Sequence, residues 1–247
     1  MWGVVSAPGA ATIIQRSVAA NQRDWLAAPQ YEYQERDQTG HGTRTYRVRM
    51  ISGSPYQQLT AINGARISPS EQLQEKRKLA AAIARRRHET PGERQRRIAA
   101  YRADRRRDHQ LMNQLTAAFD FKLVGTENLE GRRVYDLQAT PRPGYRPPNR
   151  DTRVLTGMRG ELWIDTQTFQ WVKVEAHVIH PVWIEGFIAR VEPGTRFELE
   201  YRPVSDGVWL PSHYQMQATA KVLFVFSHHD QADQAYYDYR KAGPPAE

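Results

Sequence analysis

Residues 160–176 read GELWIDTQTFQWVKVEA, and this stretch predicts two strands joined by a tight polar connection at residues 165–168. Because side chains alternate across a strand, each predicted face can be read from the sequence. The first is a plain core face, with Leu162, Ile164, Val172, Val174 and Ala176. The second mixes charges with three large aromatic rings, and it holds Glu161, Trp163, Asp165, Phe169, Trp171, Lys173 and Glu175.

The two indoles on the second face pose the question of what that face meets. Two exposed tryptophans on one patch of a sheet are unusual unless something binds there. We therefore predict that at least one of Trp163 and Trp171 packs under a helix or under the proline-rich loop at residues 141–148, or lines a cavity.

The other strands of the chain indicate the fold class. GTRTYRVRMI at residues 42–51 alternates apolar and polar side chains, and from residue 120 onward almost every segment reads as a strand. Runs of strands with short connections favour an antiparallel sheet over βαβ units. Several strands are apolar on both faces, so we expect helices at residues 11–28 and 68–119 to cover one face. The prediction is an α+β fold with a large curved antiparallel sheet.

The space between this sheet and its helices has two interpretations. If the sheet curls, the concave side lines a cavity for an apolar ligand, whereas otherwise the same side chains form a thicker ordinary core. The sequence leaves both open. The candidate cavity residues are large apolar side chains on predicted strands, namely Tyr46, Val48, Met50, Trp163, Trp171, Phe187, Trp209, Phe224 and Phe226.

Residues 68–119 interrupt the strands and read as helical throughout. SPSE at residues 68–71 is a helix start signal, with a capping hydroxyl, a proline in the first turn and an acid near the positive end of the helix dipole. TPGE at residues 90–93 predicts the start of a second helix. We expect one domain over residues 1–247, with residues 68–119 as a basic helical insertion.

Arginine is concentrated in the middle of this insertion. A solvated helix face is one interpretation, and contact with an anionic membrane surface or an acidic protein is the other. Nucleic acid is an unlikely partner, because acidic residues are interspersed and no aromatic residues alternate with the arginines for base stacking. The candidate contact residues are Arg85, Arg86, Arg87, Arg94, Arg97, Arg105 and Arg106.

Composition and motifs narrow the classes of function. The net charge is +8, which favours anionic partners, and the chain has no cysteine, which excludes disulfides, zinc–thiolate sites and cysteine nucleophiles. The motifs of serine hydrolases, zinc proteases and phosphate-binding loops do not occur, so we predict no catalytic residue, no metal and no cofactor. His228-His229-Asp230 is expected to be a surface turn.

Two features of the sequence concern membranes and export. No stretch approaches the roughly 20 apolar residues that a membrane-spanning helix needs. The first residues, MWGVVSAPGAAT, lack the positively charged start of an intact signal peptide.

The strand pattern resembles a known family. LWIDTQTFQWVKVEA, in which an Ile-Asp pair precedes a polar turn and a strand ending in an acid, and YRVRM with the glycine-containing break after it, are similar to LolA/LolB-like outer-membrane lipoprotein-sorting proteins. RseB-type periplasmic sensors share that fold. The resemblance covers most of the chain and implies one LolA-like domain, an unclosed β-barrel with helices packed in its mouth that holds acyl chains. It also implies a periplasmic location, so we expect a removed signal peptide.

These observations lead to two hypotheses of function. The first is a non-enzymatic periplasmic binding or carrier protein that holds an acyl chain or a lipidated peptide in an apolar cavity, with a lipid or a lipidated protein as its partner. The alternative is an interaction or sensor protein whose arginine-rich helices dock on an acidic partner or an anionic membrane surface. An enzyme is the least favoured class.

Overall fold

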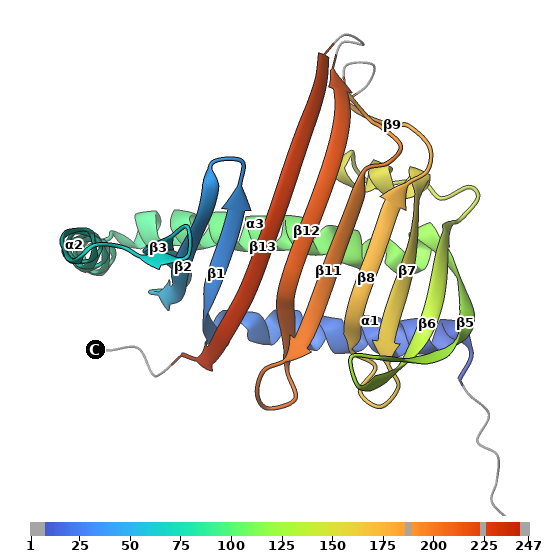
Figure 1. Cartoon of the computed structure of the whole chain (residues 1–247), viewed down its shortest axis with the longest axis horizontal. Coiled ribbons are helices and arrows are strands. Elements are labelled where there is room, and N and C mark those ends of the chain that lie inside the picture. Colours follow the sequence, from blue (N-terminus) through green and yellow to red (C-terminus); the bar gives the residue numbers. More distant parts are fainter. Residues whose placement is uncertain (1–7, 186–188, 223–225, 243–247) are drawn as a thin grey trace, which may run out of the picture.

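All strands of the described residues lie in one antiparallel sheet, whose main path runs β4-β3-β2-β1-β13-β12-β11-β8-β7-β6-β5. The computed structural model describes residues 8–185, 189–222 and 226–242. The short strands β9 and β10 pair with each other, and β10 also pairs with β12. The two ends of the main path, β4 and β5, do not pair with each other, so the sheet stays open (Figure 1).

The elements have the following bounds. The helical segments are α1 (Ala10–Ala27), η1 (Ala28–Gln30), α2 (Pro69–Arg87), α3 (Pro91–Ala118) and η2 (Asp151–Gly157). The strands are β1 (Tyr31–Thr39), β2 (Gly42–Ile51), β3 (Ser54–Ile62), β4 (Ala65–Arg66), β5 (Phe119–Leu129), β6 (Arg132–Pro141), β7 (Met158–Asp165), β8 (Trp171–Val178), β9 (Val182–Glu185), β10 (Ala189–Val191), β11 (Arg196–Pro203), β12 (Trp209–Val222) and β13 (Phe226–Lys241).

Two helices cover one face of the sheet. Figure 1 shows α1 and α3 running across the strands on the side away from the viewer, while α2 lies beyond the β3 edge. We call this side the helix-covered face and the other side the open face. The predicted α+β fold, with an unclosed antiparallel sheet and helices on one face, is confirmed. None of the helices among the described residues has the length and apolarity that crossing a bilayer requires.

The helical insertion connects the two opposite edges of the sheet, because it lies in the chain between β4 and β5. Eleven strands at about 4.8 Å spacing make a sheet roughly 48 Å wide. A helix of 28 residues with a rise of 1.5 Å is about 42 Å long, so α3 alone spans most of that width. The length of α3 therefore follows from the topology.

Both predicted helix starts are confirmed as capping boxes. The Ser68 hydroxyl accepts from the Glu71 backbone N–H, and the Ser68 N–H donates to Glu71 Oε2 at 2.8 Å. Thr90 and Glu93 repeat this arrangement, with 2.9 Å between Thr90 N and Glu93 Oε2. Each box satisfies backbone donors that the first turn of a helix leaves without partners.

The hairpin at residues 160–176 is formed by β7 and β8, but its faces differ from strict alternation. Trp163 pairs with Lys173, and the next residue, Ile164, pairs with Trp171, so Val172 is an extra residue in β8. Such a β-bulge reverses the side-chain alternation beyond it. The prediction that Trp163 and Trp171 share a face is therefore wrong. Trp171 joins Leu162 in the main core and is 2% exposed, which confirms that at least one indole is buried.

Phe169 also reaches the core, and the turn before β8 explains how. Asp165 Oδ1 accepts from the backbone N–H groups of Gln167 and Thr168 at 3.0 and 2.8 Å, an Asx-type turn. Phe169 then takes a positive φ of 60°, which is uncommon for a residue with a side chain. Its ring is buried, with the guanidinium of Arg16 on α1 at 3.5 Å from the ring centre.

The main hydrophobic core lies between the helices and the β5–β8 half of the sheet. α1 contributes Ile13 and Ile14 from its first turns, and α3 contributes Ala118 at its end. On the strands, Leu137 and Ile164 are fully buried. This half of the helix-covered face is filled by aliphatic side chains and packed rings.

Trp163 keeps the position that alternation predicts. Its Nε1 donates to Glu127 Oε1, and the Lys173 ammonium lies 6.0 Å from its ring centre. It packs at the margin of a small second cluster made of Val134, Val172 and Trp209. The aromatic residues of the second face therefore separate, with two in the core and Trp163 among charges.

The predicted turn at His228-His229-Asp230 is wrong. The backbone of these residues lies in β13 and pairs with residues 218–220 of β12. Because β13 begins at Phe226, these three residues lie within a strand and not in a turn.

Candidate functional site

A cavity of about 450 Å³ lies under the other half of the helix-covered face. Its floor is formed by strands β1, β2, β3, β11, β12 and β13, and its roof by the last turns of α1 and the middle of α3. This volume is within the range of about 300–1,000 Å³ that is typical of small-molecule sites.

Aromatic rings make up much of the cavity lining. They are Trp25, Tyr33, Tyr101, Tyr201, Trp209, Tyr236 and Tyr239. Aliphatic and methionine side chains fill the spaces between them, namely Val48, Met50, Met112, Leu199 and Leu210. The polar and charged lining residues are Asn21, Asp24, Arg105 and His109, all on the two helices. The cavity thus has an apolar floor and a roof that carries charged groups.

Three tyrosines on the central strands form what we call the tyrosine wall: Tyr33, Tyr236 and Tyr239. The ring of Tyr33 lies 5.9 Å from that of Tyr236 and 5.2 Å from that of Tyr239, between ring centres. The Tyr239 hydroxyl donates to the Pro211 carbonyl at 2.7 Å, and the Tyr236 hydroxyl donates to Gln234 Oε1 at 2.8 Å. Each of these two hydrogen bonds fixes the hydroxyl end of a rigid ring.

A second β-bulge brings Tyr236 and Tyr239 to the same face. Tyr237 pairs with Gln34 and Arg240 pairs with Glu32, so two residues of β13 oppose Tyr33. Asp238 has a positive φ of 53°, a conformation in which aspartate is over-represented. Strict alternation would place Tyr236 and Tyr239 on opposite faces, and the bulge is what builds the wall.

The tyrosines of the cavity stay uncharged at physiological pH. Burial raises the pKa of Tyr201 to about 12, and it raises the pKa of Tyr33, Tyr236 and Tyr239 well above the ordinary value. Their hydroxyls can donate or accept hydrogen bonds, but they carry no charge toward a ligand.

Asp24 is the acidic group of the roof, and it is 6% exposed. Burial raises its pKa to about 6, although a hydrogen bond from the Trp209 backbone N–H, the charge of Arg23 and a hydrogen bond from the Gln170 side chain each lower it. One of its oxygens, Oδ2, is enclosed and has no hydrogen-bond partner. A buried carboxylate of this kind is costly when ionised.

The basic end of the roof is a stack on Trp25. Arg105 and His109 are one turn apart on α3 and therefore on the same side of that helix. The imidazole of His109 stacks on the Trp25 ring at 4.5 Å, and the Arg105 guanidinium lies 4.4 Å from the Trp25 ring centre. Arg105 also donates to the Trp25 backbone carbonyl.

The surroundings of His109 favour its neutral form. Burial, followed by the charge of Arg105, lowers its pKa. Its Nε2 lies 2.6 Å from Gln22 Oε1, which requires the proton on Nε2 if the amide oxygen accepts. The histidine thus fixes the position of Trp25 between the two helices and leaves Arg105 as the charged group of the stack.

The structure brings together three of the nine residues predicted for the cavity. Val48, Met50 and Trp209 line it. Tyr46, Trp163 and Trp171 do not line it. Phe187 and Phe224 lie outside the described residues, as does the side chain of Phe226 at the start of β13.

Sequence reasoning missed the tyrosine wall and the Trp25 stack. Both had a signal. YEYQER at residues 31–36 and YYDYR at residues 236–240 place tyrosines in strands, and Trp25 lies on the apolar side of the first helix. What the pattern did not contain was the bulge at Asp238 and the pairing of β1 with β13, which join the two tyrosine segments.

Two of the seven predicted surface arginines hold the turn between β2 and β3 in place. Arg86 Nη1 donates to the carbonyls of Ile51 and Ser54 at 2.8 and 2.9 Å, and Nη2 donates to that of Pro55 at 3.0 Å. Arg97 contacts the same turn while paired to Glu89 at 2.6 Å. These two guanidinium groups have a structural role.

The turn itself depends on glycine. Gly53 has φ of +89°, and Ile98 of α3 packs where a Cβ would lie, at 3.0 Å. Arg105 belongs to the cavity roof, so three of the predicted surface arginines are engaged within the molecule. Of the rest, Arg94 and Arg106 are exposed and line a shallow depression on α3 together with Arg102.

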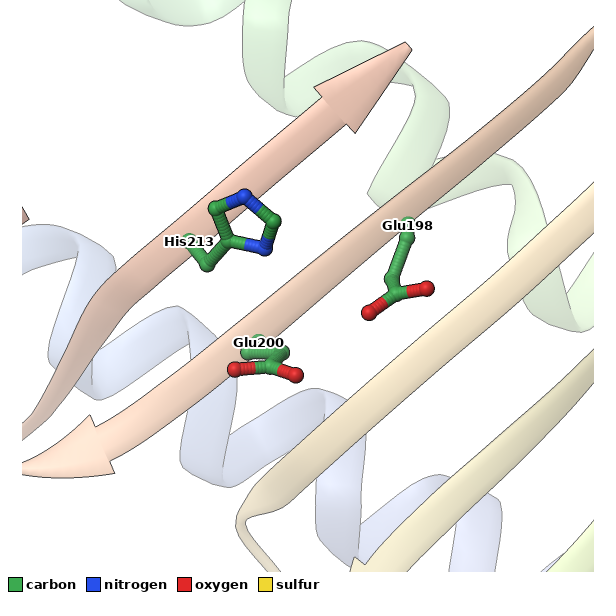
Figure 2. Close-up of side chains that lie close together, drawn as sticks. All are labelled: Glu198, Glu200 and His213. Atoms are coloured by element: carbon green, nitrogen blue, oxygen red, sulfur yellow. The ribbon is translucent and has the colours of Figure 1, made fainter. Parts of the chain in front are cut away.

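A separate group on the sheet has the side chains of a metal site. Figure 2 shows Glu198 and Glu200 on β11 beside His213 on β12, and their donor atoms lie within 4.8 Å of one another. Histidine and carboxylates of this kind are able to bind a divalent cation.

Each member of this group already has a charged neighbour. Lys173 Nζ lies 3.1 Å from Glu198, Arg202 lies 3.9 Å from Glu200, and His213 Nε2 lies 3.0 Å from Asp233. These contacts form an ion-pair network at a partly exposed surface, where such pairs are common. The network accounts for the side chains without a metal.

No family model matches the chain, and no curated protein matches it. Solved structures do show similarity. A LolA superfamily protein from Nitrosomonas europaea is 13% identical, with 97% of this chain and 96% of that chain covered and a TM-score of 0.33. An outer membrane lipoprotein-sorting protein domain from Vibrio parahaemolyticus is 12% identical, with 92% of each chain covered and a TM-score of 0.34.

The complex of MucA and MucB from Pseudomonas aeruginosa contains a further similar chain. It is 11% identical, with 89% of this chain and 93% of that chain covered and a TM-score of 0.25. The resemblance to LolA-like proteins that the sequence indicates is thus also found among solved structures. At these identities and TM-scores it transfers no ligand, partner or location to this chain.

Proposed function

We propose that this chain is a non-enzymatic binding or carrier protein that holds the apolar part of a lipid or lipidated peptide in the cavity between its helices and sheet. The observation that carries the proposal is the cavity of about 450 Å³, with an aromatic and aliphatic lining. The apolar part of the lining gives an acyl chain surfaces for dispersion contacts. The periplasmic location is part of the proposal and rests on the resemblance of residues 162–176.

The free energy of burying an acyl chain is large enough to give measurable affinity. Each methylene removed from water contributes about 0.8 kcal/mol, so twelve of them contribute roughly 10 kcal/mol. Association costs about 4–15 kcal/mol in lost freedom of motion, so the balance depends on how rigid the site is before binding. Rings that are held at both ends lower that cost.

The direct test is native mass spectrometry of the protein purified from a bacterial host, followed by titration with a fluorescent fatty acid. We expect a co-purified lipid-sized mass and saturable binding. Met112→Trp should fill the cavity and abolish binding while the protein stays folded. Leu73→Trp, a similar change at a half-exposed position of α2, is the matched control and should bind like the parent. Equal binding by both variants would contradict the proposal.

The alternative function, docking on an anionic membrane surface or an acidic protein, is supported by one observation. Residues 69–118 contain thirteen Lys and Arg and six Asp and Glu, a net charge of +7 out of +8 for the whole chain. Arg94, Arg102 and Arg106 are exposed on the outer side of α3. Clustered charge of one sign attracts anionic surfaces over about one Debye length.

Co-sedimentation with vesicles separates the two functions. Docking predicts binding that requires anionic lipid, weakens at high salt, and is lost in the triple Arg-to-Gln variant at positions 94, 102 and 106. Cavity binding predicts fatty-acid uptake that high salt does not change. Binding to neutral and anionic vesicles alike would count against the docking hypothesis.

A further inference from the structure

The Arg105 guanidinium has fewer partners than several other half-buried arginines. Arg97 is paired with Glu89, Arg190 is paired with Glu192, and Arg86 donates to three carbonyls. Among the described residues, Arg105 makes one hydrogen bond, to the Trp25 carbonyl, and no carboxylate lies within 4.0 Å of it. A guanidinium has five N–H donors, so most of those on Arg105 are unused.

The stack on Trp25 orients these unused donors. A guanidinium that lies on an aromatic face has its N–H groups at its edges, in the plane of the group. Trp25 is itself held by His109, which stacks on it at 4.5 Å and bonds to Gln22. Arg105 is therefore a positioned cation at the boundary of the cavity, and fork-shaped donors of this kind match carboxylate and phosphate oxygens.

The rest of the cavity fits an apolar body. Val48, Met50 and the tyrosine wall line its floor, and the tyrosines carry no charge. The charged groups of the lining lie on the roof. A molecule that matches both parts has one anionic end and one apolar end.

Asp24 is the group that could instead favour a cationic end. Its carboxyl already receives the Trp209 N–H, and its Oδ2 is enclosed rather than open to the cavity. Arg105 is the more accessible of the two charged groups, because it is half-buried whereas Asp24 is buried. The roof thus presents a cation to the ligand.

We propose that the ligand is an amphiphile with a single anionic head, a carboxylate or a phosphate, and that Arg105 binds this head while the apolar body lies against the tyrosine wall. This inference rests on the proposed function, because it assigns an orientation and a chemical class to the molecule in the cavity. The carboxylate of a free fatty acid and the phosphate of a lipid headgroup share the recognised chemistry.

The test compares a fluorescent fatty acid with its methyl ester, which has the same chain and no charge. We expect the parent to bind the acid at least tenfold more tightly than the ester, as a charge-assisted hydrogen bond predicts. Arg105→Gln should weaken binding of the acid about tenfold or more and leave ester binding unchanged, which also shows that the variant is folded. Arg107→Gln, an exposed arginine outside the cavity, should keep the preference.

Five outcomes separate the claims. Equal binding of acid and ester by the parent overturns the anionic head but leaves the cavity function intact. If the parent binds neither the acid nor the ester, both the anionic head and the cavity function are wrong. Preference for a long-chain amine over the acid indicates a cationic head at Asp24 and overturns the inference. Displacement of the acid by inorganic phosphate alone would show a free-anion site, whereas displacement by a single-chain phospholipid in detergent, and not by phosphate, supports a lipid source.

Discussion

The two halves of the helix-covered face are covered by the same two helices, yet one half is filled and the other is hollow. Over β5–β8, the start of α1 contributes Ile13 and Ile14 to a core of aliphatic side chains and packed rings. Over β1–β3 and β11–β13, the end of α1 contributes Asp24 and Trp25 to the lining of the cavity. Within one helix, the composition changes from isoleucine to aromatic and charged residues over three turns.

The difference shows how a void is kept in a folded protein. Aliphatic side chains have several rotamers and close the gaps between layers, so interiors reach the density of organic crystals. Tyrosine rings are rigid, and in the wall the hydroxyls of Tyr236 and Tyr239 are hydrogen-bonded at their far ends. Rings that are fixed at both ends cannot fold over to fill the space. Substitutions in each half test this difference in packing.

Trp171→Ala should destabilise the filled half by about 3–5 kcal/mol, because it removes a buried ring and leaves a large hole. Trp171→Phe should restore most of the loss, since the indole Nε1 has no partner to lose. Trp163→Ala, on the same hairpin but among charges, should cost about 1 kcal/mol or less. Urea unfolding measures all three, and equal losses for the two alanine variants would refute the reversal of faces at Val172.

Asp24→Asn should stabilise the hollow half in a pH-dependent way. The pKa of Asp24 is raised from 3.8 to about 6, so the folded chain holds this proton more tightly than the unfolded chain. The stabilising contribution of protonation is complete below about pH 4 and is lost as the pH rises through about 6. At about pH 8 the neutral variant should gain up to roughly 3 kcal/mol over the parent. A gain that persists at about pH 4 would exclude this cause.

Arg86→Ala should lower stability by about 1–3 kcal/mol, because three carbonyls of the β2–β3 turn lose a charged donor. The neighbouring Arg85 is exposed, and Arg85→Ala should change the unfolding midpoint little. Comparison of the two variants tests which arginines stabilise the β2–β3 turn and which only face solvent. If Arg85→Ala costs as much as Arg86→Ala, the distinction fails.

Tyr239→Phe should have the smallest effect on stability, about 1 kcal/mol, since one hydrogen bond to Pro211 is lost. Its effect on ligand binding should be larger than its effect on stability. A ring whose far end is no longer hydrogen-bonded can rotate into the cavity. We expect weaker fatty-acid uptake at nearly parental stability. Tyr237→Phe, on the exposed neighbour, serves as the control. Unchanged uptake in Tyr239→Phe would argue against the role of the hydroxyls.

Alternation and helix signals predict the fold well where the strands are regular. The strand at residues 42–51, the two helix starts at residues 68 and 90, and the covering of one sheet face all follow from local patterns. The strand and the helix starts depend on neighbouring residues only, and the covered face is indicated by strands that are apolar on both sides.

The details of the candidate site were harder to predict, and bulges are the main reason. Val172 reverses the faces of β8, and Asp238 gathers Tyr236 and Tyr239 on one side of β13. A bulge is a single extra residue set by pairing with another strand, so it leaves no mark in a period-2 pattern. The partners of Arg86 and Arg105 are likewise distant in sequence, and charge runs alone cannot distinguish a structural arginine from an exposed one.

The central position of β13 has a consequence for how the sheet folds. β13 pairs with β1 on one side and with β12 on the other, and Tyr31 faces Lys241 across 210 positions of sequence. Without β13, the main path of the sheet divides into two blocks with unpaired edges at β1 and β12, and such edges are prone to mispairing. Because Tyr236 and Tyr239 lie on this strand, the cavity is complete only once β13 joins the two blocks. On the proposed function, a ligand can therefore be held only after β13 has paired with both blocks.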